Sequence, residues 1–324
     1  MNSAKRNAYM DFLKGIAIVA MVMGHCISDI PKEGILCNVI YSFHMPLLMF
    51  VSAYIEEQNR EKYAEKEWKM LLKRAGGLLI PYISWSFLYE LFFGQIWEIN
   101  IENFMLQLSG YRQSGLWFFP VLFGLKILHC FYWQAQKVVG KHNLIKDVLI
   151  CCLLGIVTAL AALLTKQPYI INMISYMIPY FLAVIVIDNE MLWKMTNSEW
   201  MTAGVFLIYL IIFPYYCFDN THWSTQMIRI VLSLCIIVIC CRYQQKWKPD
   251  GLGKILCLFG ENSLAIYVLH RFFIDDAWNL RLVNMPYIAA IAAGLLAFAI
   301  SGTCVVIARI ISISSWWRKI LFGK

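Results

Sequence analysis

Charged residues are scarce in this sequence. Only 15% of the 324 residues are Asp, Glu, Lys or Arg, whereas 60% are hydrophobic, and the mean hydropathy is +0.61. No linker, low-complexity tract or soluble domain interrupts the apolar runs. This composition excludes an ordinary soluble domain, in which about a quarter of the residues are charged. The chain is therefore predicted to be a polytopic membrane protein.

A metal-binding pattern and an export signal are also lacking. The 11 cysteines show no ligand spacing, and Cys151 with Cys152 and Cys240 with Cys241 are adjacent pairs within apolar runs. We expect these cysteines to be small core residues, and we expect no metal. The first apolar segment contains charges and no A-x-A-like cleavage site, so it is predicted to be a retained anchor.

Apolar windows long enough to cross a membrane recur along the whole chain. A crossing helix needs about 20 residues, and such windows begin near residues 10, 34, 75, 115, 147, 170, 201, 226, 255 and 287. We predict an all-α bundle of about ten transmembrane helices, as one domain over residues 1–324 without an appended soluble domain. The polar break at residues 165–168 is short, which leaves nine or eleven helices as alternatives.

The distribution of basic residues predicts the orientation. Cytoplasmic loops retain Lys and Arg. With the N-terminus inside, the outer loops contain only Lys32, Arg112, Lys166 and Arg281. Both termini are then cytoplasmic, in a multi-pass protein that we expect to lie among the lipids of the plasma membrane.

The net charge of +8 is thus a topological signal, and we expect no nucleic-acid partner. One long charged loop, residues 56–74, mixes both signs at helical spacing. It is predicted to be a solvated helix that continues the second span.

Three polar residues in the first span suggest a function. Asp11, Lys14 and His25 lie in YMDFLKGIAIVAMVMGHC, although a charge in lipid costs roughly 2.5 to 3.5 kcal/mol on insertion scales. The steps from Lys14 to His25 rotate a helix by about 1,100°, so the two side chains share one face, about 16 Å apart. This arrangement suits acyl-coenzyme A, whose phosphates would meet Lys14, Lys73 and Arg74 while its thioester reaches His25. The alternative is a structural Asp11–Lys14 ion pair and a histidine that bonds a carbonyl.

Further polar residues favour a buried polar site. The second, third and ninth spans contain His44, Glu90, Glu261, Asn262, Ser263 and His270. Three histidines together with acids in one bundle indicate a site more strongly than a lone membrane histidine does. The remaining histidines, His129, His142 and His222, are predicted to be structural or solvated.

Several of these segments resemble one known family. They are, in chain order, RNAYMDFLKGIAIVAMVMGH, FHMPLLMFVSAY, LLKRAGGLLIPY, GLWFFPVLFG and NSLAIYVLH. Together they resemble the bacterial acyltransferase-3 family, and within it the fucose 4-O-acetylase-like glycan acetylases. The resemblance implies transfer of an acetyl group from cytoplasmic acetyl-coenzyme A, as co-substrate, to a sugar hydroxyl of a surface or cell-wall glycan.

The resemblance also implies roles for single residues. Lys14, where many relatives have arginine, and His25 match the family's core functional pair; lysine keeps the charge but lacks the bidentate fork of arginine. Lys73 and Arg74 match a basic pair implicated in donor binding, although some relatives have an arginine-x-arginine form. Some relatives carry an extracytoplasmic esterase-like domain. Here the acceptor is expected to reach the bundle itself, or a separate extracytoplasmic partner protein completes the transfer.

A sugar hydroxyl is a poor nucleophile, so the reaction needs a base and donors for the thioester oxyanion. His25 is the predicted general base, with a covalent acetyl-histidine as the alternative. The candidate acids are Asp11, Glu90 and Glu261. Asp11 is too far down the same helix to contact His25, whereas either glutamate would serve if the bundle brings it close. The candidate acceptor or oxyanion contacts are His44, Trp117, Asn262, Ser263 and His270.

Two other classes of function remain open. A transporter or flippase for a glycan intermediate or small solute would use the polar residues as a translocation path, although no internal repeat supports an inverted-repeat design. An accessory subunit without catalysis would tolerate the loss of His25. The alignment of Lys14 with His25, together with the ordered segments, favours the acyltransferase.

Overall fold

The structure is a computed structural model that describes residues 7–27, 34–63, 66–93, 100–112, 115–140, 143–196, 198–217, 222–244, 247–274 and 286–324, without the side chains of residues 190, 191 and 286. Lys32, His142 and Arg281, which entered the predictions above, lie outside these ranges.

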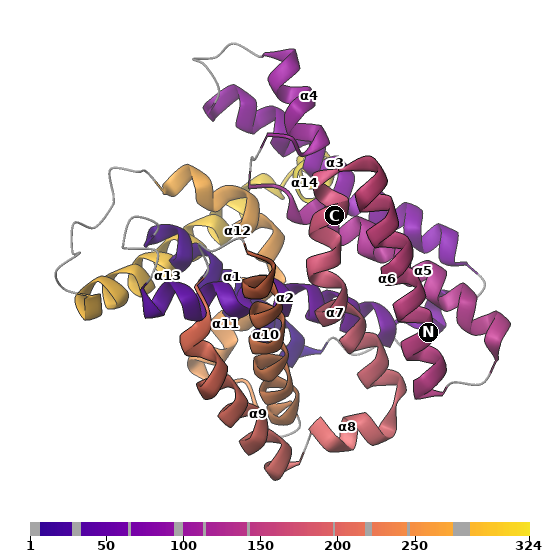
Figure 1. Cartoon of the computed structure of the whole chain (residues 1–324). Coiled ribbons are helices and arrows are strands. Elements are labelled where there is room, and N and C mark those ends of the chain that lie inside the picture. The colour runs from indigo at the N-terminus through magenta and orange to yellow at the C-terminus, as the bar shows by residue number, and fades with distance from the viewer. Residues whose placement is uncertain are drawn as a thin grey trace. The chain divides into compact units, whose positions relative to one another are not determined.

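All secondary structure within the described ranges is helical (Figure 1). The helices are α1 Ala8–Cys26, α2 Ile35–Gln58, α3 Glu67–Phe93, α4 Ile101–Ser109, α5 Phe118–Val139, α6 Leu144–Thr165, α7 Pro168–Asp188, α8 Glu190–Thr196, α9 Glu199–Ile212, α10 Trp223–Tyr243, α11 Gly251–Glu261, α12 Ser263–Leu269, α13 Pro286–Ile311 and α14 Ser315–Phe322, with 3-10 turns η1 Arg60–Tyr63, η2 Phe213–Tyr215 and η3 His270–Phe273. The prediction of an all-α protein is confirmed.

Side-chain caps explain where several helices begin. The side chains of Asn100, Asn143 and Asp250 accept hydrogen bonds from backbone N–H groups of the first turns of α4, α6 and α11, at 3.1, 2.9 and 3.1 Å. Such caps satisfy donors that a helix start leaves without an intrahelical partner. The polar break after residue 165 separates α6 from α7, because Lys166 has a positive φ of 51° and Pro168 begins the next helix.

Among the residues that the structure describes, seven helices are long and apolar enough to cross a membrane, namely α1, α2, α3, α6, α7, α10 and α13. A bent pair, α11 with α12 and η3, would be an eighth crossing, broken by a 70° bend. The two remaining predicted windows coincide with α5 and the shorter α9. The chain is therefore a polytopic helical bundle, and the count of about ten crossings remains a prediction.

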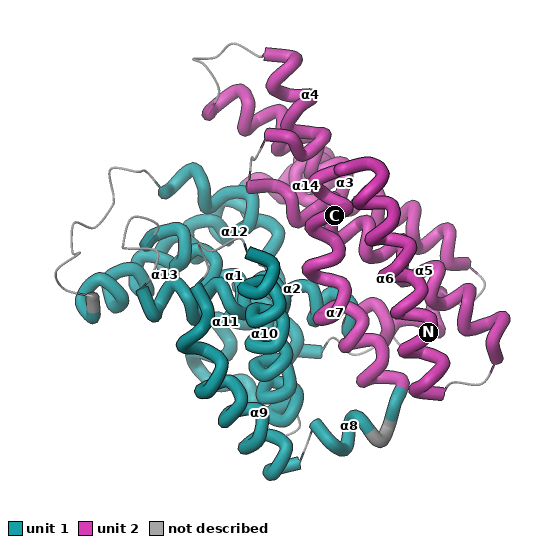
Figure 2. The backbone as a smooth tube through the Cα atoms, in the orientation of Figure 1, with its two compact units in different colours: residues 1–55, 189–310 teal, residues 56–188, 311–324 magenta. Residues whose placement is uncertain are grey.

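The chain forms two compact units (Figure 2). Unit 1 consists of residues 1–55 and 189–310, and unit 2 of residues 56–188 and 311–324. The single domain expected over the whole chain remains a prediction.

In unit 1, α1 and α11 touch backbone to backbone. A Cβ atom at Gly15 would lie 1.9 Å from the carbonyl oxygen of Leu256, and one at Gly260 would lie 1.8 Å from that of Asp11. Only glycine permits this approach, which resembles the small-residue packing of membrane helices. The contact fixes the polar first helix against the bent pair.

In unit 2, segments predicted on the same side of the membrane contact each other. Lys137 pairs with Glu67, joining two predicted inner loops. Gln167 donates to the carbonyl oxygen of Ser109 at 2.7 Å, joining two predicted outer loops. This grouping agrees with the loop assignment made from the basic residues.

The C-terminal segment folds as helix α14 and packs on α3. Trp85 Nε1 donates to the carbonyl oxygen of Leu321 at 2.7 Å. Leu321 and Phe322 are buried, whereas Trp316 and Trp317 are exposed, as expected for side chains at a membrane interface.

Candidate functional site: a histidine cluster in unit 1

Unit 1 brings together His25, His44 and His270 from α1, α2 and η3. The ring centroids of His25 and His270 are 5.2 Å apart, and their planes differ by 31°. The His44 ring meets that of Tyr41 edge-on, and a Cβ atom at Gly24, the residue before His25, would lie 3.2 Å from the Tyr41 ring. His44 and His270 are buried, whereas His25 is half-buried. The sequence predicted these three histidines as parts of a site, and the structure groups them.

Backbone contacts define the tautomers of two of these rings. Nδ1 of His44 lies 2.7 Å from the carbonyl oxygen of Ile40, and Nδ1 of His270 lies 3.1 Å from that of Ile266. A carbonyl oxygen only accepts, so each Nδ1 carries the hydrogen when the ring is neutral. Each Nε2 then keeps its lone pair for another hydrogen bond, and both rings have fixed orientations.

The predicted cation of the first span lies on the same helix as His25. Because α1 is continuous from Ala8 to Cys26, the predicted shared face of Lys14 and His25 holds along it. Lys14 Nζ lies 3.8 Å from Asp11 Oδ1, and the Lys14 side chain is 22% exposed. The Asp11–Lys14 ion pair considered above is therefore present, and Lys14 remains accessible.

The predicted polar residues of the ninth span lie at its break. Asn262 ends α11, with its side chain donating to the carbonyl oxygen of Leu258 at 2.9 Å, and Ser263 begins α12. Glu261 is exposed, and Ser263 is half-buried. The break lies two residues after Gly260, where α11 contacts Asp11 of α1, and η3 begins at His270 directly after α12. The bent pair therefore places polar residues beside α1 both at the break and at His270.

Sequence reasoning missed Arg271 as a member of this group. It directly follows His270 in η3, the turn that ends the bent pair. Within the described ranges, no group of three His, Cys, Asp or Glu side chains is arranged to hold a metal ion. In the sequence, Arg271 could have been noticed because a histidine and an arginine stand side by side at the end of an apolar run.

The other predicted site residues belong to unit 2. Lys73 is exposed, and Arg74 Nε lies 3.1 Å from Glu56 Oε2. Glu90 is buried and accepts from Arg112 Nη1 at 2.7 Å. Arg74 and Glu90 are thus each paired with an oppositely charged residue of unit 2.

Trp117 also lies in unit 2, beside α7. Its ring stacks on Tyr176, with centroids 5.2 Å apart and planes 20° apart. Both residues line a cavity of about 400 Å³.

The prediction of a solvated helix for residues 56–74 is wrong for Glu56, Glu57 and Glu67. The second helix ends at Gln58 and the third begins at Glu67, while Glu56, Glu57 and Glu67 are buried. They are buried because cations and donors of other helices reach them, which a single-helix pattern cannot reveal.

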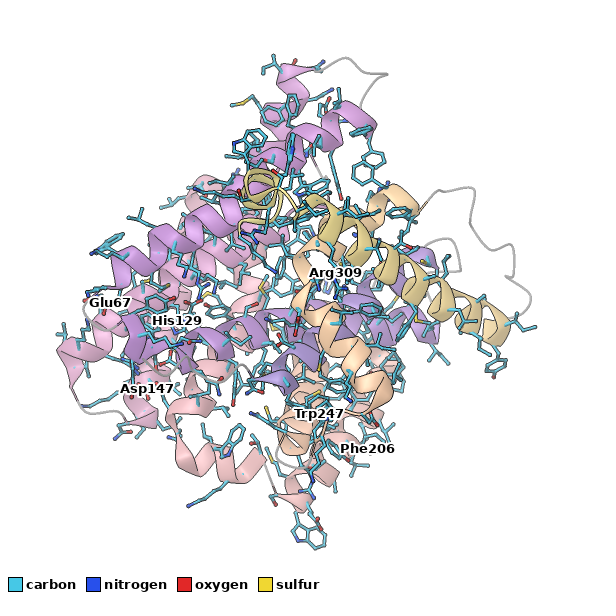
Figure 3. All side chains as sticks on the ribbon, turned by 180° about the vertical axis from the view of Figure 1, so that it is seen from behind. Glu67, His129, Asp147, Phe206, Trp247 and Arg309 are labelled. Carbon is cyan, nitrogen blue, oxygen red and sulfur yellow. The ribbon has the colours of Figure 1, made fainter. Side chains whose placement is uncertain are left out.

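These acids belong to a polar network inside unit 2. Lys126 pairs with Glu56, and Glu57 Oε2 contacts His129 Nε2 at 2.6 Å and accepts from Trp133 Nε1 at 2.8 Å. Glu67, His129 and Asp147 are labelled in Figure 3 and come from α3, α5 and α6. The structural role predicted for His129 agrees with its burial and its two hydrogen bonds. The spacing of Lys126, His129 and Trp133 along one face of an apolar window could have revealed this network.

We expect Glu57→Ala to destabilise the protein by about 3 kcal/mol, because it leaves His129 and Trp133 buried without their acceptor. The matched control is Glu61→Ala, since Glu61 is exposed in η1. Thermal unfolding in detergent measures the difference. Equal melting temperatures for the two variants would contradict the network.

Fold and site together define a polytopic helical membrane protein with a buried histidine cluster. The chain belongs to the acyltransferase-3 family, because the family model described as "Acyltransferase domain" matches residues 7–309. This match confirms the predicted membership of the acyltransferase-3 family.

Two curated relatives are distantly similar. Nodulation protein NolL of Sinorhizobium fredii (strain NBRC 101917 / NGR234) is 25% identical over 191 residues, which cover 54% of this chain and 47% of the relative. Nodulation protein NolL of Mesorhizobium japonicum (strain LMG 29417 / CECT 9101 / MAFF 303099) is 24% identical over 227 residues, which cover 66% and 56%. The chain thus spans about half the length of these relatives. No solved structure matches it significantly.

Proposed function

We propose that the protein is a plasma-membrane O-acetyltransferase that moves an acetyl group from cytoplasmic acetyl-coenzyme A to a sugar hydroxyl of a surface or cell-wall glycan. The observation that carries this proposal is the contact between the rings of His25 and His270, in which His25 lies on the helix that also carries Lys14. Family membership supports acyl transfer, and the polar residues along α1 and the bent pair suit an extended donor.

His25 is the proposed general base. It takes the proton of the sugar hydroxyl while the hydroxyl oxygen forms a bond to the thioester carbonyl carbon. The carbon–sulfur bond then breaks, and the coenzyme A thiolate leaves with the proton returned by the imidazolium. His25 suits this role because the residue is half-buried and its ring lies beside that of His270.

The neighbouring groups have complementary proposed roles. His44 and His270, each with an acceptor Nε2, would receive hydrogen bonds from acceptor hydroxyls or orient His25. Arg271 would stabilise the negative charge that develops on the thioester oxygen. Asn262 and Ser263 would offer further polar contacts at the helix break.

Lys14, Lys73 and Arg74 are the proposed contacts for the donor's phosphates. Asp11 would orient Lys14 through the ion pair described above. Of the other acids considered for catalysis, Glu90 pairs with Arg112 in unit 2, and Glu261 is exposed in unit 1. Their proposed contribution is therefore electrostatic.

Lys14→Ala is expected to raise the KM for acetyl-coenzyme A about tenfold with a smaller change in kcat, because it removes a charge-assisted contact to phosphate. Lys14→Arg should retain most affinity, since the charge remains. Lys254→Ala is the control, because this lysine is exposed on α11. An unchanged KM for Lys14→Ala would remove Lys14 from donor binding.

The overall proposal is tested by supplying radioactive acetyl-coenzyme A to membranes with and without the protein and measuring label in glycan. Protein-dependent label supports acetyl transfer. Label that remains on the protein before acceptor is added would indicate the acetyl-histidine route. If no label is transferred to glycan and the protein instead carries a solute at a rate that depends on the membrane potential, a transporter is favoured.

A further inference from the structure

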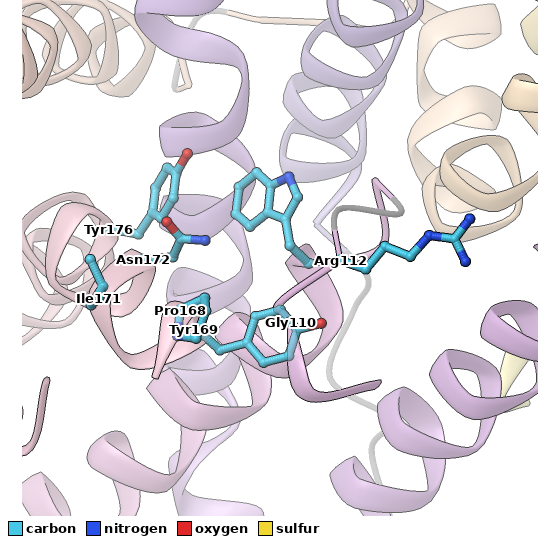
Figure 4. A pocket seen from close by; sticks show the side chains of 8 residues that line it. Gly110, Arg112, Pro168, Tyr169, Ile171, Asn172 and Tyr176 are labelled. Atoms are coloured by element: carbon cyan, nitrogen blue, oxygen red, sulfur yellow. The ribbon is translucent and has the colours of Figure 1, made fainter. Parts of the chain in front are cut away.

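A cavity in unit 2 is formed by two chain segments that are distant in sequence. The first segment follows α4 and contributes Gly110, Arg112 and Trp117; the second is the start of α7 (Figure 4). The cavity has a volume of about 400 Å³, within the range of small-molecule sites. The topology predicted from the basic residues places both segments outside the cytoplasm.

The aromatic wall of this cavity is held rigidly. Trp117 stacks on Tyr176, which is buried. The Tyr169 hydroxyl lies 2.6 Å from that of Tyr82 and donates to the carbonyl oxygen of Gln107 at 2.9 Å. Gly110, with a φ of 85°, leaves room for the Tyr169 ring, which a Cβ atom would approach to 2.7 Å. Rigid aromatic surfaces bind ligands at a low entropic cost.

The polar groups of the cavity favour a neutral ligand. Arg112 is paired with Glu90 at 2.7 Å, and its side chain points away from Asn172 and Tyr176 (Figure 4). The arginine charge is therefore balanced. The Asn172 side chain has no hydrogen-bond partner in the part of the chain that the structure describes, so its two donors and one acceptor are available.

We propose that this cavity binds a neutral pyranose unit of the acceptor glycan. This inference rests on the proposed function for the identity of the acceptor. A pyranose ring presents an apolar C–H face, which packs on an aromatic ring, and an edge of hydroxyl groups, which suits an amide. An acyl chain would leave the Asn172 amide unsatisfied, and an anionic ligand would face a cation that Glu90 already neutralises.

The test is saturation-transfer NMR with the full chain in phosphatidylcholine nanodiscs, using methyl β-D-glucopyranoside, methyl N-acetyl-β-D-glucosaminide and, as the charged comparison, methyl β-D-glucuronide. We expect binding of at least one neutral glycoside and weaker binding of the glucuronide. Trp117→Ala should weaken neutral binding about tenfold, and Asn172→Ala about fivefold. Trp117→Phe should retain most binding, because the ring surface remains.

Trp223→Ala is the matched control, because Trp223 is exposed at the start of α10 on the same predicted side. Binding that survives Trp117→Ala and Asn172→Ala, or no binding of any glycoside, would overturn the proposal. Adding phosphatidylglycerol to the nanodiscs tests whether a lipid occupies the cavity. If this lipid alone displaces the glycoside, the pyranose proposal is also overturned.

Acetyl transfer measured on the same preparations separates the two proposals. If transfer proceeds and Trp117→Ala leaves the acceptor KM unchanged, the cavity assignment is wrong and the acetyltransferase proposal stands. If glycoside binding depends on Trp117 but no acetyl group is transferred from acetyl-coenzyme A, the proposed function is wrong and the sugar site stands.

Discussion

His25→Ala is expected to lower acetyl transfer from acetyl-coenzyme A to glycan by at least about 100-fold, the lower bound for losing a positioned general base. The sugar hydroxyl keeps its proton until a base removes it, and alanine offers none. His270, 5.2 Å from His25 between ring centroids, is held through its own Nδ1 contact to Ile266 and should not replace it. Label incorporation from radioactive donor, at matched protein abundance, measures the effect.

The control for this variant is His222→Ala. His222 is exposed and its side chain caps the start of α10 in the same unit, so its loss should leave transfer within about twofold, at the cost of a helix cap. Equal labelling by wild type and His25→Ala would contradict the catalytic assignment. That result would favour an accessory or transport role.

Gly260→Ala is expected to destabilise the protein by about 3 kcal/mol or more and to abolish transfer. The added Cβ would lie 1.8 Å from the carbonyl oxygen of Asp11 and 2.9 Å from the backbone nitrogen of Gly15. Both neighbours are backbone atoms, so no side-chain rotation relieves the overlap, and α1 must separate from α11. Since α1 carries Lys14 and His25, the displacement also disrupts the proposed site.

The matched control is Gly302→Ala in α13, because a Cβ at Gly302 meets no atom within 4 Å. It should be neutral or slightly stabilising, since alanine has the higher helix propensity. Melting temperature and monodispersity in detergent distinguish the two variants. If Gly260→Ala and Gly302→Ala have the same melting temperature, the close contact of α1 with α11 is wrong.

Helical segments were predictable because local physics determines them. Among the described residues, the predicted crossing windows coincide with helices, one of them with the bent pair of α11 and α12, since a lipid-exposed backbone must satisfy its own hydrogen bonds. The separation of α6 from α7 followed from Pro168 and the polar residues before it. The shared face of Lys14 and His25 needed only the helical repeat.

Partners across helices were less predictable. The sequence marked Glu56 and Glu57 as part of a charged loop, but their burial depends on Lys126 and His129, 70 and 72 residues later. The role of Trp117 as a cavity wall likewise depends on Tyr176. In membrane helices the outer face is apolar too, so apolar periodicity gives little information about which face meets which neighbour.

Reading the sequence alone predicts a helical membrane protein that resembles the acyltransferase-3 family, with Lys14 and His25 on one helix face. Composition, helical geometry and ordered segments suffice for that, because each is a property of one segment or of segment order. Three features become visible in the folded chain alone: His25 meets His270, α1 meets α11 at Gly15 and Gly260, and buried acids join α3 and α5 with the end of α2. These are contacts between distant segments, and packing selects them from many pairings that the same apolar pattern allows.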